Sequence, residues 1–216
     1  MSMMARFVAI TPDQLAMIKD TPEMVAGVFA PDAGLPFESS FDLLERLRRK
    51  APQLVADMFE HGLPNPRVGD AVPLQVAQGE AARRRVPPPA TPGHSISLDK
   101  AWHGLHYLLC GAPEPVPGPL GQAVFGGSEI GEDQGYGPAR YFSPAQVAEI
   151  AAALQAPGLE RDLRGRFDGP AMTRLGIYPG GWEADEGAWL IEAFHTLRDF
   201  YAAASKAERA VVTLIE

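Results

Sequence analysis

The segment from Ser97 to Cys110 carries the clearest apolar periodicity of the chain. At about 100° per residue its apolar side chains fall on one arc of a helix, and the glycine at position 111 is typical of a helix C-cap. The arc consists of Leu98, Ala101, Trp102, Leu105, Leu108 and Leu109. The sequence therefore predicts a helix over 97–110 whose tryptophan and leucines face a hydrophobic core.

The opposite face of the predicted helix carries Asp99, His103, His106 and Cys110, at spacings of four, three and four residues. Such spacings place side chains next to one another on a helix. Imidazoles and a thiol suit zinc, but four ligands along one helix rise too far to close a tetrahedron, so we assign no metal. We predict a polar helix face that packs against a loop and carries no assigned catalytic residue, and Asp99, His103 and His106 are its candidates for acid–base chemistry.

Cys110 is the only cysteine of the chain, which excludes an intramolecular disulfide and is typical of a reducing compartment. It stands at the C-terminal end of the predicted helix, where the helix dipole disfavours a thiolate, and we interpret it as a small buried residue. Residues 1–10 hold no apolar stretch long enough for a signal peptide, and no run of about 18 apolar residues predicts a transmembrane helix. We therefore predict a cytoplasmic protein without membrane contact.

Turn and capping signals divide most of the remaining chain into short strands and helices. The predicted strands are Arg6–Ile10, Leu120–Phe125, Ala139–Phe142 and Arg209–Ile215, the last of them central in a sheet. Helices are predicted to begin at Thr11, Thr21, Ser40 and Ser143, and a long amphipathic helix covers 185–206. This order predicts an α+β fold, in which a small mixed or antiparallel sheet is covered by the 97–110 helix and the C-terminal helix.

Residues 62–95 interrupt this pattern with prolines at 64, 66, 73, 87, 88, 89 and 92 and show no apolar periodicity. The run Pro87–Pro89 favours extended polyproline geometry. The preceding residues 1–61 offer too few strands and helices for a core of their own. We therefore predict a single compact domain over 1–216 with a proline-rich surface insertion at about 62–95.

The segment 126–137 is rich in glycine and in acidic residues, and we predict a loop. It matches neither the calcium-loop spacing nor the phosphate-binding loop that ends in Gly-Lys-Ser/Thr. A loop that carries charged and aromatic side chains is nevertheless typical of a binding site. The candidate ligand-binding residues are Lys100, Glu129, Glu132, Asp133, Tyr136, Arg140 and Tyr178. We interpret the large aromatics at core-facing positions as packing residues.

The charge balance favours some partners over others. Nineteen basic residues stand against 27 acidic ones, which gives a formal net charge of −8. The two basic clusters, at 46–50 and 83–85, are short, whereas phosphate backbones need a concentrated basic face. We therefore predict no binding to nucleic acid, and an acidic surface suits the capture of a basic protein.

Several segments, in order along the chain, resemble the YfbM-like family of uncharacterised bacterial proteins. They are Met3/Phe7/Ile10, Leu98–Gly111, Pro119–Gly127, Gly131–Arg140, Leu163–Phe167 and Ile177–Pro179, and together they span nearly the whole chain. The most specific are Asp-Lys-x-Trp-x-x-Leu-His at 99–106 and Ile-Tyr-Pro at 177–179. The resemblance implies an α+β fold, a bacterial cytoplasmic context and no established activity. It also implies that neither His103 nor Cys110 is indispensable, since some relatives carry an acidic residue and a threonine at these positions.

Two functions of different class fit these observations. The first, which we favour, is a non-catalytic binding protein, for example of the inhibitor or immunity type, that captures a basic partner. The second is an enzyme or small-ligand-binding protein whose pocket joins the Asp99–His106 face to the Glu129–Arg140 segment. In that pocket Lys100 and Arg140 hold an anion and His106 acts as acid or base, which requires that its nitrogens open to the pocket. No cofactor motif is found, and the sequence carries no signal for the oligomeric state.

Overall fold

The computed structural model describes residues 3–29, 63–64, 71–72 and 95–216. Two compact units are distinguished, one formed by 1–25 and 90–216 and the other by 26–89. In the second unit β2 (Leu63–Pro64) pairs antiparallel with β3 (Ala71–Val72). The helix predicted from Ser40 and most of the proline-rich segment 62–95 lie outside the described residues, so the surface insertion stays a prediction.

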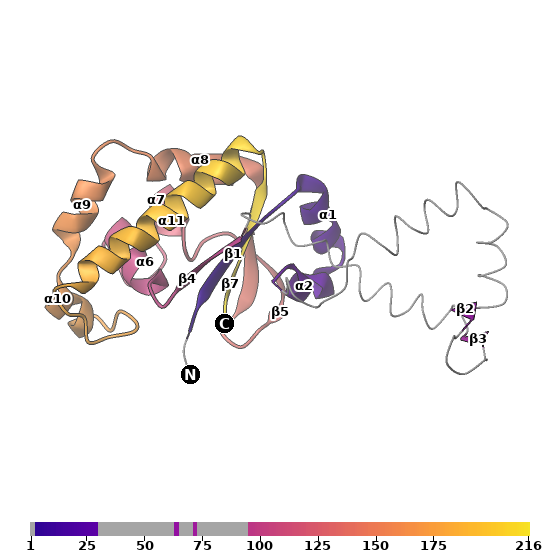
Figure 1. The fold of residues 1–216 in the computed structure, drawn as a ribbon, viewed down its shortest axis with the longest axis horizontal. Coiled ribbons are helices and arrows are strands. Elements are labelled where there is room, and N and C mark those ends of the chain that lie inside the picture. The colour runs from indigo at the N-terminus through magenta and orange to yellow at the C-terminus, as the bar shows by residue number, and fades with distance from the viewer. Residues whose placement is uncertain (1–2, 30–62, 65–70, 73–94) are drawn as a thin grey trace. The chain divides into compact units, whose positions relative to one another are not determined.

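The first unit is built on a five-stranded antiparallel sheet with the strand order β4-β1-β7-β6-β5 (Figure 1). The strands are β1 (Ala5–Ile10), β4 (Ser95–Asp99), β5 (Ser128–Asp133), β6 (Pro138–Phe142) and β7 (Ala210–Ile215). β7 lies between β1 and β6, as its long apolar run predicts, and is buried along nearly its whole length. The expected α+β fold is therefore confirmed, and the sheet is of the antiparallel kind.

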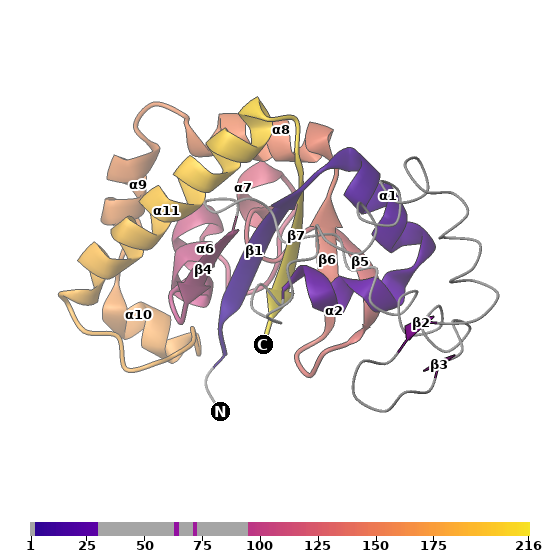
Figure 2. The same cartoon turned by 45° about the vertical axis from the view of Figure 1, so that its right-hand side comes forward.

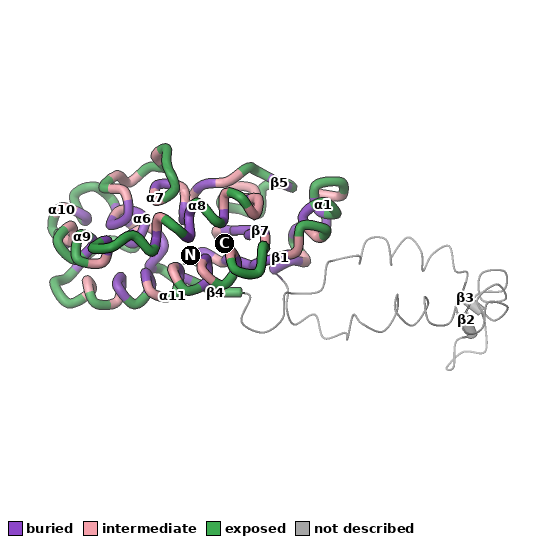
Figure 3. Tube along the Cα trace, turned by 90° about the horizontal axis from the view of Figure 1, so that it is seen from above, coloured by how far each residue is buried: buried purple, intermediate pink, exposed green. Residues whose placement is uncertain are grey.

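Helices cover the sheet on both faces. The main core lies under α6 (Trp102–Cys110), α7 (Pro119–Gln122), α8 (Pro144–Leu154), α9 (Leu159–Arg166), α10 (Gly169–Arg174) and α11 (Glu186–Lys206). On the other side of the sheet lie α1 (Pro12–Asp20) and η1 (Pro22–Met24), after which α2 (Val25–Val28) begins (Figure 2). Buried positions alternate with exposed ones along α11, whose apolar stripe faces the sheet (Figure 3).

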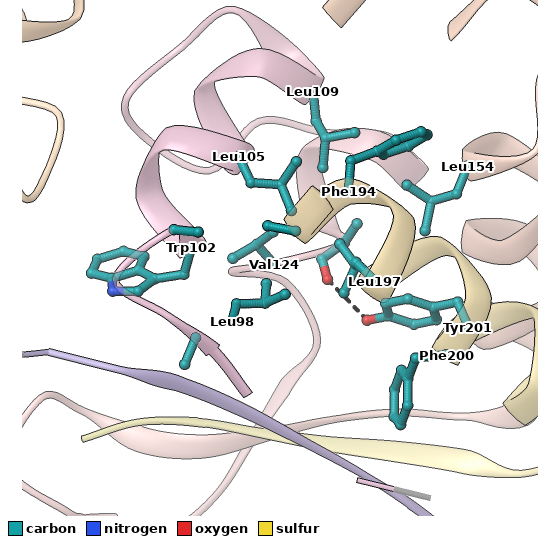
Figure 4. Packing of buried hydrophobic residues seen from close by; sticks show 14 of the residues in the cluster. Leu98, Trp102, Leu105, Leu109, Val124, Leu154, Phe194, Leu197, Phe200 and Tyr201 are labelled. Atoms are coloured by element: carbon teal, nitrogen blue, oxygen red, sulfur yellow. Dashed lines mark hydrogen bonds between the residues drawn. The ribbon is translucent and has the colours of Figure 1, made fainter. Parts of the chain in front are cut away.

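Aromatic side chains from the strands and from α11 meet in this core. Phe7 of β1 lies edge-on to Phe200 and Tyr201, at ring-centroid distances of 6.2 and 6.4 Å. The hydroxyl of the fully buried Tyr201 donates a hydrogen bond of 2.9 Å to the carbonyl oxygen of Ala123 (Figure 4). Through this bond α11 holds the turn after α7, which carries Phe125.

The predicted capping signals at Thr11, Ser143 and Gly111 are confirmed, whereas Thr21 precedes the short η1 without a side-chain cap. Thr11 and Gln14 form a reciprocal capping box at the start of α1, and Ser143 and Gln146 form another at the start of α8. Gly111 ends α6 in the left-handed conformation, at φ 77°. These signals depend on residues a few positions apart, so the sequence alone reveals them.

The helix predicted over 97–110 begins too early. Residues 95–99 form β4, Asp99 leaves the strand at φ 46°, and α6 begins at Trp102. In β4 the partly buried Ile96 and the buried Leu98 alternate with exposed serines, which is the period of a strand. The position of Leu98 also fits the helical arc, and this coincidence extends the predicted helix into the strand.

Two predictions between residues 120 and 137 are also wrong. Leu120–Phe125 is not a strand, because Pro119 starts the short helix α7 and a turn follows it. The segment 126–137 is not one loop, because β5 covers Ser128–Asp133. Only Ile130 of β5 is buried, so no apolar alternation marks this strand in the sequence, and it forms by backbone pairing with β6.

Candidate functional site

His106 of α6 is enclosed on every side. Its exposed fraction is 0%, and its Nε2 donates a hydrogen bond of 2.9 Å to the carbonyl oxygen of Glu114. A carbonyl oxygen only accepts, so the proton lies on Nε2 and a lone pair lies on Nδ1. Nδ1 is buried and has no hydrogen-bond partner in the described part of the chain, while the ring of Phe125 lies edge-on at a centroid distance of 4.4 Å. His106 therefore has no nitrogen open to a substrate.

His103 ties two other segments of the chain to α6. Its Nε2 donates to the carbonyl oxygen of Pro113 at 3.1 Å, and its Nδ1 accepts the backbone N–H of Tyr178 at 3.0 Å. Trp102 stacks on the imidazole, with ring centroids 5.0 Å apart and planes inclined by 9°. Both nitrogens are used within the fold, so His103 is a neutral residue that positions the chain at 113 and at 178.

Burial lowers the pKa of both imidazoles, and the hydrogen bonds to the carbonyl oxygens of Pro113 and Glu114 oppose that shift. The neutral forms that these hydrogen bonds use are therefore the favoured ones. The predicted packing of this helix face against a loop is found at His103 and His106, but the face is not open in the way that the pocket hypothesis requires. Helical spacing identifies neighbouring side chains, but the side that meets solvent depends on what packs there, and here the carbonyl groups of 113–114 and the ring of Phe125 cover it.

The half-buried thiol of Cys110 lies beside His106 at the end of α6. Sγ is 3.3 Å from Nε2 of His106 and 3.2 Å from the carbonyl oxygen of the same residue. Burial raises the pKa of Cys110, so the thiol form is favoured over the thiolate. The Nε2 of His106 carries a proton, so the nitrogen that faces the sulfur has no lone pair with which to act as a base.

Asp99 and Lys100 lie outside the helix face that the sequence predicts for them. Both are exposed, Asp99 at the end of β4 and Lys100 in the turn that follows. Tyr178 packs on Trp102 with ring centroids 5.7 Å apart, and its hydroxyl accepts the backbone N–H of Met3 at 3.0 Å. The predicted surface from position 99 to position 106 does not form, because the chain changes from strand to helix between the two.

The five remaining candidates all lie on the acidic hairpin, by which we mean β5, β6 and the turn between them (residues 128–142). They are Glu129, Glu132, Asp133, Tyr136 and Arg140. Glu129 stands opposite Arg140 in the strand pairing, and the two form an ion pair. A second guanidinium nitrogen of Arg140, Nη1, donates to the carbonyl oxygen of Gly127 at 3.2 Å. Glu129 of the hairpin and the carbonyl oxygen of Gly127, just before it, therefore hold Arg140 from two sides.

The turn of the acidic hairpin is closed by Asp133. Its Oδ1 accepts the backbone N–H groups of Gly135, at 2.7 Å, and of Gly137, at 3.0 Å. The φ angles of Gly135 and Gly137 are 114° and 100°, values that residues with a side chain rarely adopt. The ring of Tyr136 between them is 45% exposed. The turn thus presents an aromatic side chain on a backbone that is fixed by a carboxylate.

A hollow of about 370 Å³, which includes space open to solvent, lies beside the acidic hairpin. Among the residues that line it are Phe125, Tyr136, Pro138, Arg140, Thr213 and Ile215. Arg140 and Thr213 are paired across β6 and β7, and Thr213 is paired with Phe7 of the main core on the other side. The hollow therefore lies on the face of the sheet that the main core covers, and Arg140 and Thr213 form its floor.

Phe125 separates the hollow from the histidines. It lines the hollow, and its ring centroid lies 4.4 Å from that of His106 and 5.7 Å from that of His103. The structure thus brings Tyr136 and Arg140 together at the hollow and leaves His106 behind the phenylalanine. Sequence reasoning misses Phe125 and Thr213, because a phenylalanine after a helix and a threonine in an apolar strand both read as ordinary packing residues.

Among the described residues no three His, Cys, Asp or Glu side chains gather where they could hold a metal ion. Residues 3–29 and 95–216 also contain no helix that is both long and apolar enough to cross a membrane.

Comparison with known proteins places the chain in a family. A family model described as "Domain of unknown function (DUF1877)" matches residues 1–214. The chain belongs to this family. The crystal structure of YfbM from Escherichia coli, a protein of unknown function, has a similar fold, with 15% sequence identity, 99% of each chain covered and a TM-score of 0.54. At this identity the likeness of the DUF1877 chain to YfbM shows the fold alone, and no curated protein matches the chain. The expected YfbM-like family is confirmed, and it brings no activity with it.

Proposed function

We propose that this protein is a non-catalytic binding protein that holds a basic segment of another protein along β5. The observation that carries the proposal is the exposure of three carboxylates, those of Glu129, Glu132 and Asp133, on a strand at the edge of the sheet. In the described part of the chain β5 pairs with β6 alone, and η1 packs against it near Gly131. All three carboxylates are exposed to a partner, although Glu129 is paired with Arg140 and Oδ1 of Asp133 closes the turn of the hairpin.

The charges around β5 favour a basic partner. Glu23, on η1 beside the strand, adds a fourth exposed carboxylate. Two cations lie near: Arg140, which is paired with Glu129, and Lys19, which lies over the ring of Tyr141 on the other face of the sheet. Glu132 forms no ion pair with any described residue, and an excess of negative charge attracts a positively charged partner before contact.

The arrangement of the histidines supports binding over catalysis. A general acid or base has to reach the proton that it transfers, directly or through one water. The nitrogens of His103 and the Nε2 of His106 are occupied by the protein's own backbone groups, and the Nδ1 of His106 is enclosed. The alternative function, a reaction in a pocket centred on His106, therefore loses the group on which it depends.

An acidic edge strand also has a protective explanation, because charges on an edge discourage unwanted pairing with other strands. The two explanations differ in what they expect from a basic peptide. Protection requires only that other strands stay away, whereas the proposed function requires that a basic segment binds at β5 more tightly than elsewhere on the acidic surface. An inhibitor or immunity-type role is the special case in which the bound segment belongs to an enzyme or toxin.

The test uses a fluorescent peptide of alternating lysine and valine, whose binding is followed by anisotropy at low and at physiological ionic strength. Reversal of one charge in Glu132→Lys should weaken binding by about fivefold, because an exposed ion pair contributes up to ~1 kcal/mol. Glu149→Lys is the matched control, since Glu149 is also exposed, on α8, and the net charge changes by the same amount.

Equal weakening by Glu132→Lys and Glu149→Lys would mean that the peptide responds to net charge alone, and the proposed site on β5 would be wrong. The same holds if the peptide binds no more tightly than a peptide of alternating glutamate and valine. Weakening by Glu132→Lys alone, with a strong dependence on salt, is the result that supports the proposal.

A further inference from the structure

Thr213 is a largely buried residue whose hydroxyl makes no hydrogen bond in the described part of the chain and keeps some access to the hollow. Thr213 is 6% exposed, lies in the middle of the central strand β7 and lines the hollow. Its side chain makes no hydrogen bond with any residue that the structure describes. Because this hydroxyl is accessible from the hollow and is not used within the described residues, it is available to a ligand or to a water molecule there.

Arg140 supplies further donors beside this hydroxyl. It is directly opposite Thr213 across the β6–β7 pairing, and its Nη1 and Nη2 are bonded to the carbonyl oxygen of Gly127 and to the carboxylate of Glu129. A guanidinium group has five N–H donors, so these two bonds leave others for a further acceptor. The floor of the hollow therefore combines a cation with an unpaired hydroxyl, a set of donors that suits a carboxylate.

The walls of the hollow are apolar. Phe125 and Tyr136 present aromatic rings, and Ile215 and Pro138 add aliphatic surface. The enclosed part of the hollow is smaller than an ordinary small-molecule pocket, so an occupant would lie partly inside the hollow and partly in solvent. An occupant of these walls has a flat or apolar body, because aromatic rings stack on such groups and gain from removing them from water. A free inorganic anion would leave the walls unused.

We propose that the hollow binds a small molecule that carries a carboxylate on an aromatic body. The carboxylate accepts hydrogen bonds from the guanidinium of Arg140 and from the hydroxyl of Thr213, and the body lies between Phe125 and Tyr136. This site is separate in ligand and in chemistry from the binding of a basic segment to β5. No bond is made or broken, so the site is one of recognition only.

Substitution of Glu129 distinguishes this proposal from the proposed binding of a basic segment. Its carboxylate occupies one side of Arg140 and repels a second carboxylate that approaches the same guanidinium. Glu129→Gln removes the negative charge and should therefore tighten the binding of a carboxylate ligand. The same substitution should weaken the binding of a basic segment to β5. The two proposals thus expect opposite effects from one variant, so that either can fail without the other.

The experiment compares phenylacetate with its neutral counterpart phenylacetamide, both titrated into the isotopically labelled full chain and followed by amide NMR. Phenylacetate should bind at least about fivefold more tightly than phenylacetamide, because hydrogen bonds to a charged acceptor are about twice as strong as neutral ones. The amide signals that shift should be those of the hollow, notably Gly137, Thr213 and Ile215.

Three variants complete the test. Thr213→Val should weaken phenylacetate by about threefold to tenfold without lowering the melting temperature, since it removes only the unpaired hydroxyl. Glu129→Gln should tighten phenylacetate, whereas the control Glu149→Gln, which removes the same charge from α8, should leave its affinity unchanged. The proposal is overturned if neither probe binds, if both bind equally, if the shifted signals lie outside the hollow, or if Glu129→Gln acts like the control.

Discussion

Removal of a hydroxyl should stabilise this protein at Thr213 and destabilise it at Tyr201. Both hydroxyls lie in the same core region. The hydroxyl of Tyr201 donates a hydrogen bond of 2.9 Å to the carbonyl oxygen of Ala123, whereas the hydroxyl of Thr213 makes no hydrogen bond to a described residue. Tyr201→Phe and Thr213→Val delete these hydroxyls with little change of shape. The pair therefore isolates the effect of having a partner.

The magnitude follows from what each deletion leaves behind. In Tyr201→Phe the carbonyl oxygen of Ala123, a residue with no exposed surface, stays buried and unpaired, which costs about 1–3 kcal/mol. In Thr213→Val an unpaired hydroxyl is replaced by a methyl group in a buried site. The free energy of unfolding should rise by about 1 kcal/mol. This is the low end of the cost of an unpaired polar group, because the hollow gives the hydroxyl some access to water.

Thermal and urea unfolding of the two variants and the wild type measure this difference. For a chain of this length 1 kcal/mol corresponds to a shift of about 2–4 °C in Tm, so the variants should differ by roughly 4–16 °C, with the wild type between them. A loss of stability in Thr213→Val equal to that in Tyr201→Phe would refute the reasoning. It would show that the threonine hydroxyl has a partner inside the fold and is not available to a ligand.

Two further predictions concern the histidines and the glycines. Burial lowers the pKa of His103 and His106 in the folded protein below the ordinary value of 6.5, so the unfolded chain binds more protons as the pH falls through 6.5. The free energy of unfolding that is present above pH 6.5 should therefore decrease as the pH falls from there to the lowered values. Urea unfolding on both sides of pH 6.5 measures this decrease, and a flat profile would contradict it. Gly104→Ala should cost about 1–3 kcal/mol, because its Cβ would lie 2.5 Å from the ring of Trp182. Gly165→Ala on α9, where nothing lies within 4 Å, should add about 0.5–1 kcal/mol, and the opposite order of Tm values would contradict both assignments.

The parts of the fold that local chemistry dictates are predictable from the sequence. Thr11 and Ser143 start their helices because each has a glutamine three residues later, and β7 is a long apolar strand because it is covered on both faces. β5 and β4 escape prediction for the opposite reason. β5 buries only Ile130 and exists through its pairing with β6, and β4 contains a leucine that also fits a helical arc.

The candidate site is predictable only in its charges. The glycine-rich segment and its neighbours carry the charged residues Glu129 and Arg140 and the aromatic Tyr136, which stand out in the sequence for that reason. The structure places Arg140 and Tyr136 at the hollow, with Glu129 bonded to Arg140. The histidines mislead because a sequence shows which side chains are neighbours on α6 but not which segment packs over them. Thr213 carries no signal, since only the coordinates show that its hydroxyl has no partner.

The histidines and the hollow are nevertheless connected through one stretch of chain. His103 and His106 hold the carbonyl groups of residues 113 and 114, and Tyr201 holds that of residue 123. Between these anchors the chain forms α7, and directly after them it places Phe125, which packs on both imidazoles and forms a wall of the hollow. A histidine that transferred protons would need a nitrogen open to the substrate. In His103 and His106 the nitrogens are instead hydrogen-bonded to the backbone or enclosed, which suits residues that hold Phe125 in place. The side chains in this sequence that most resemble catalytic groups therefore serve the hollow by position.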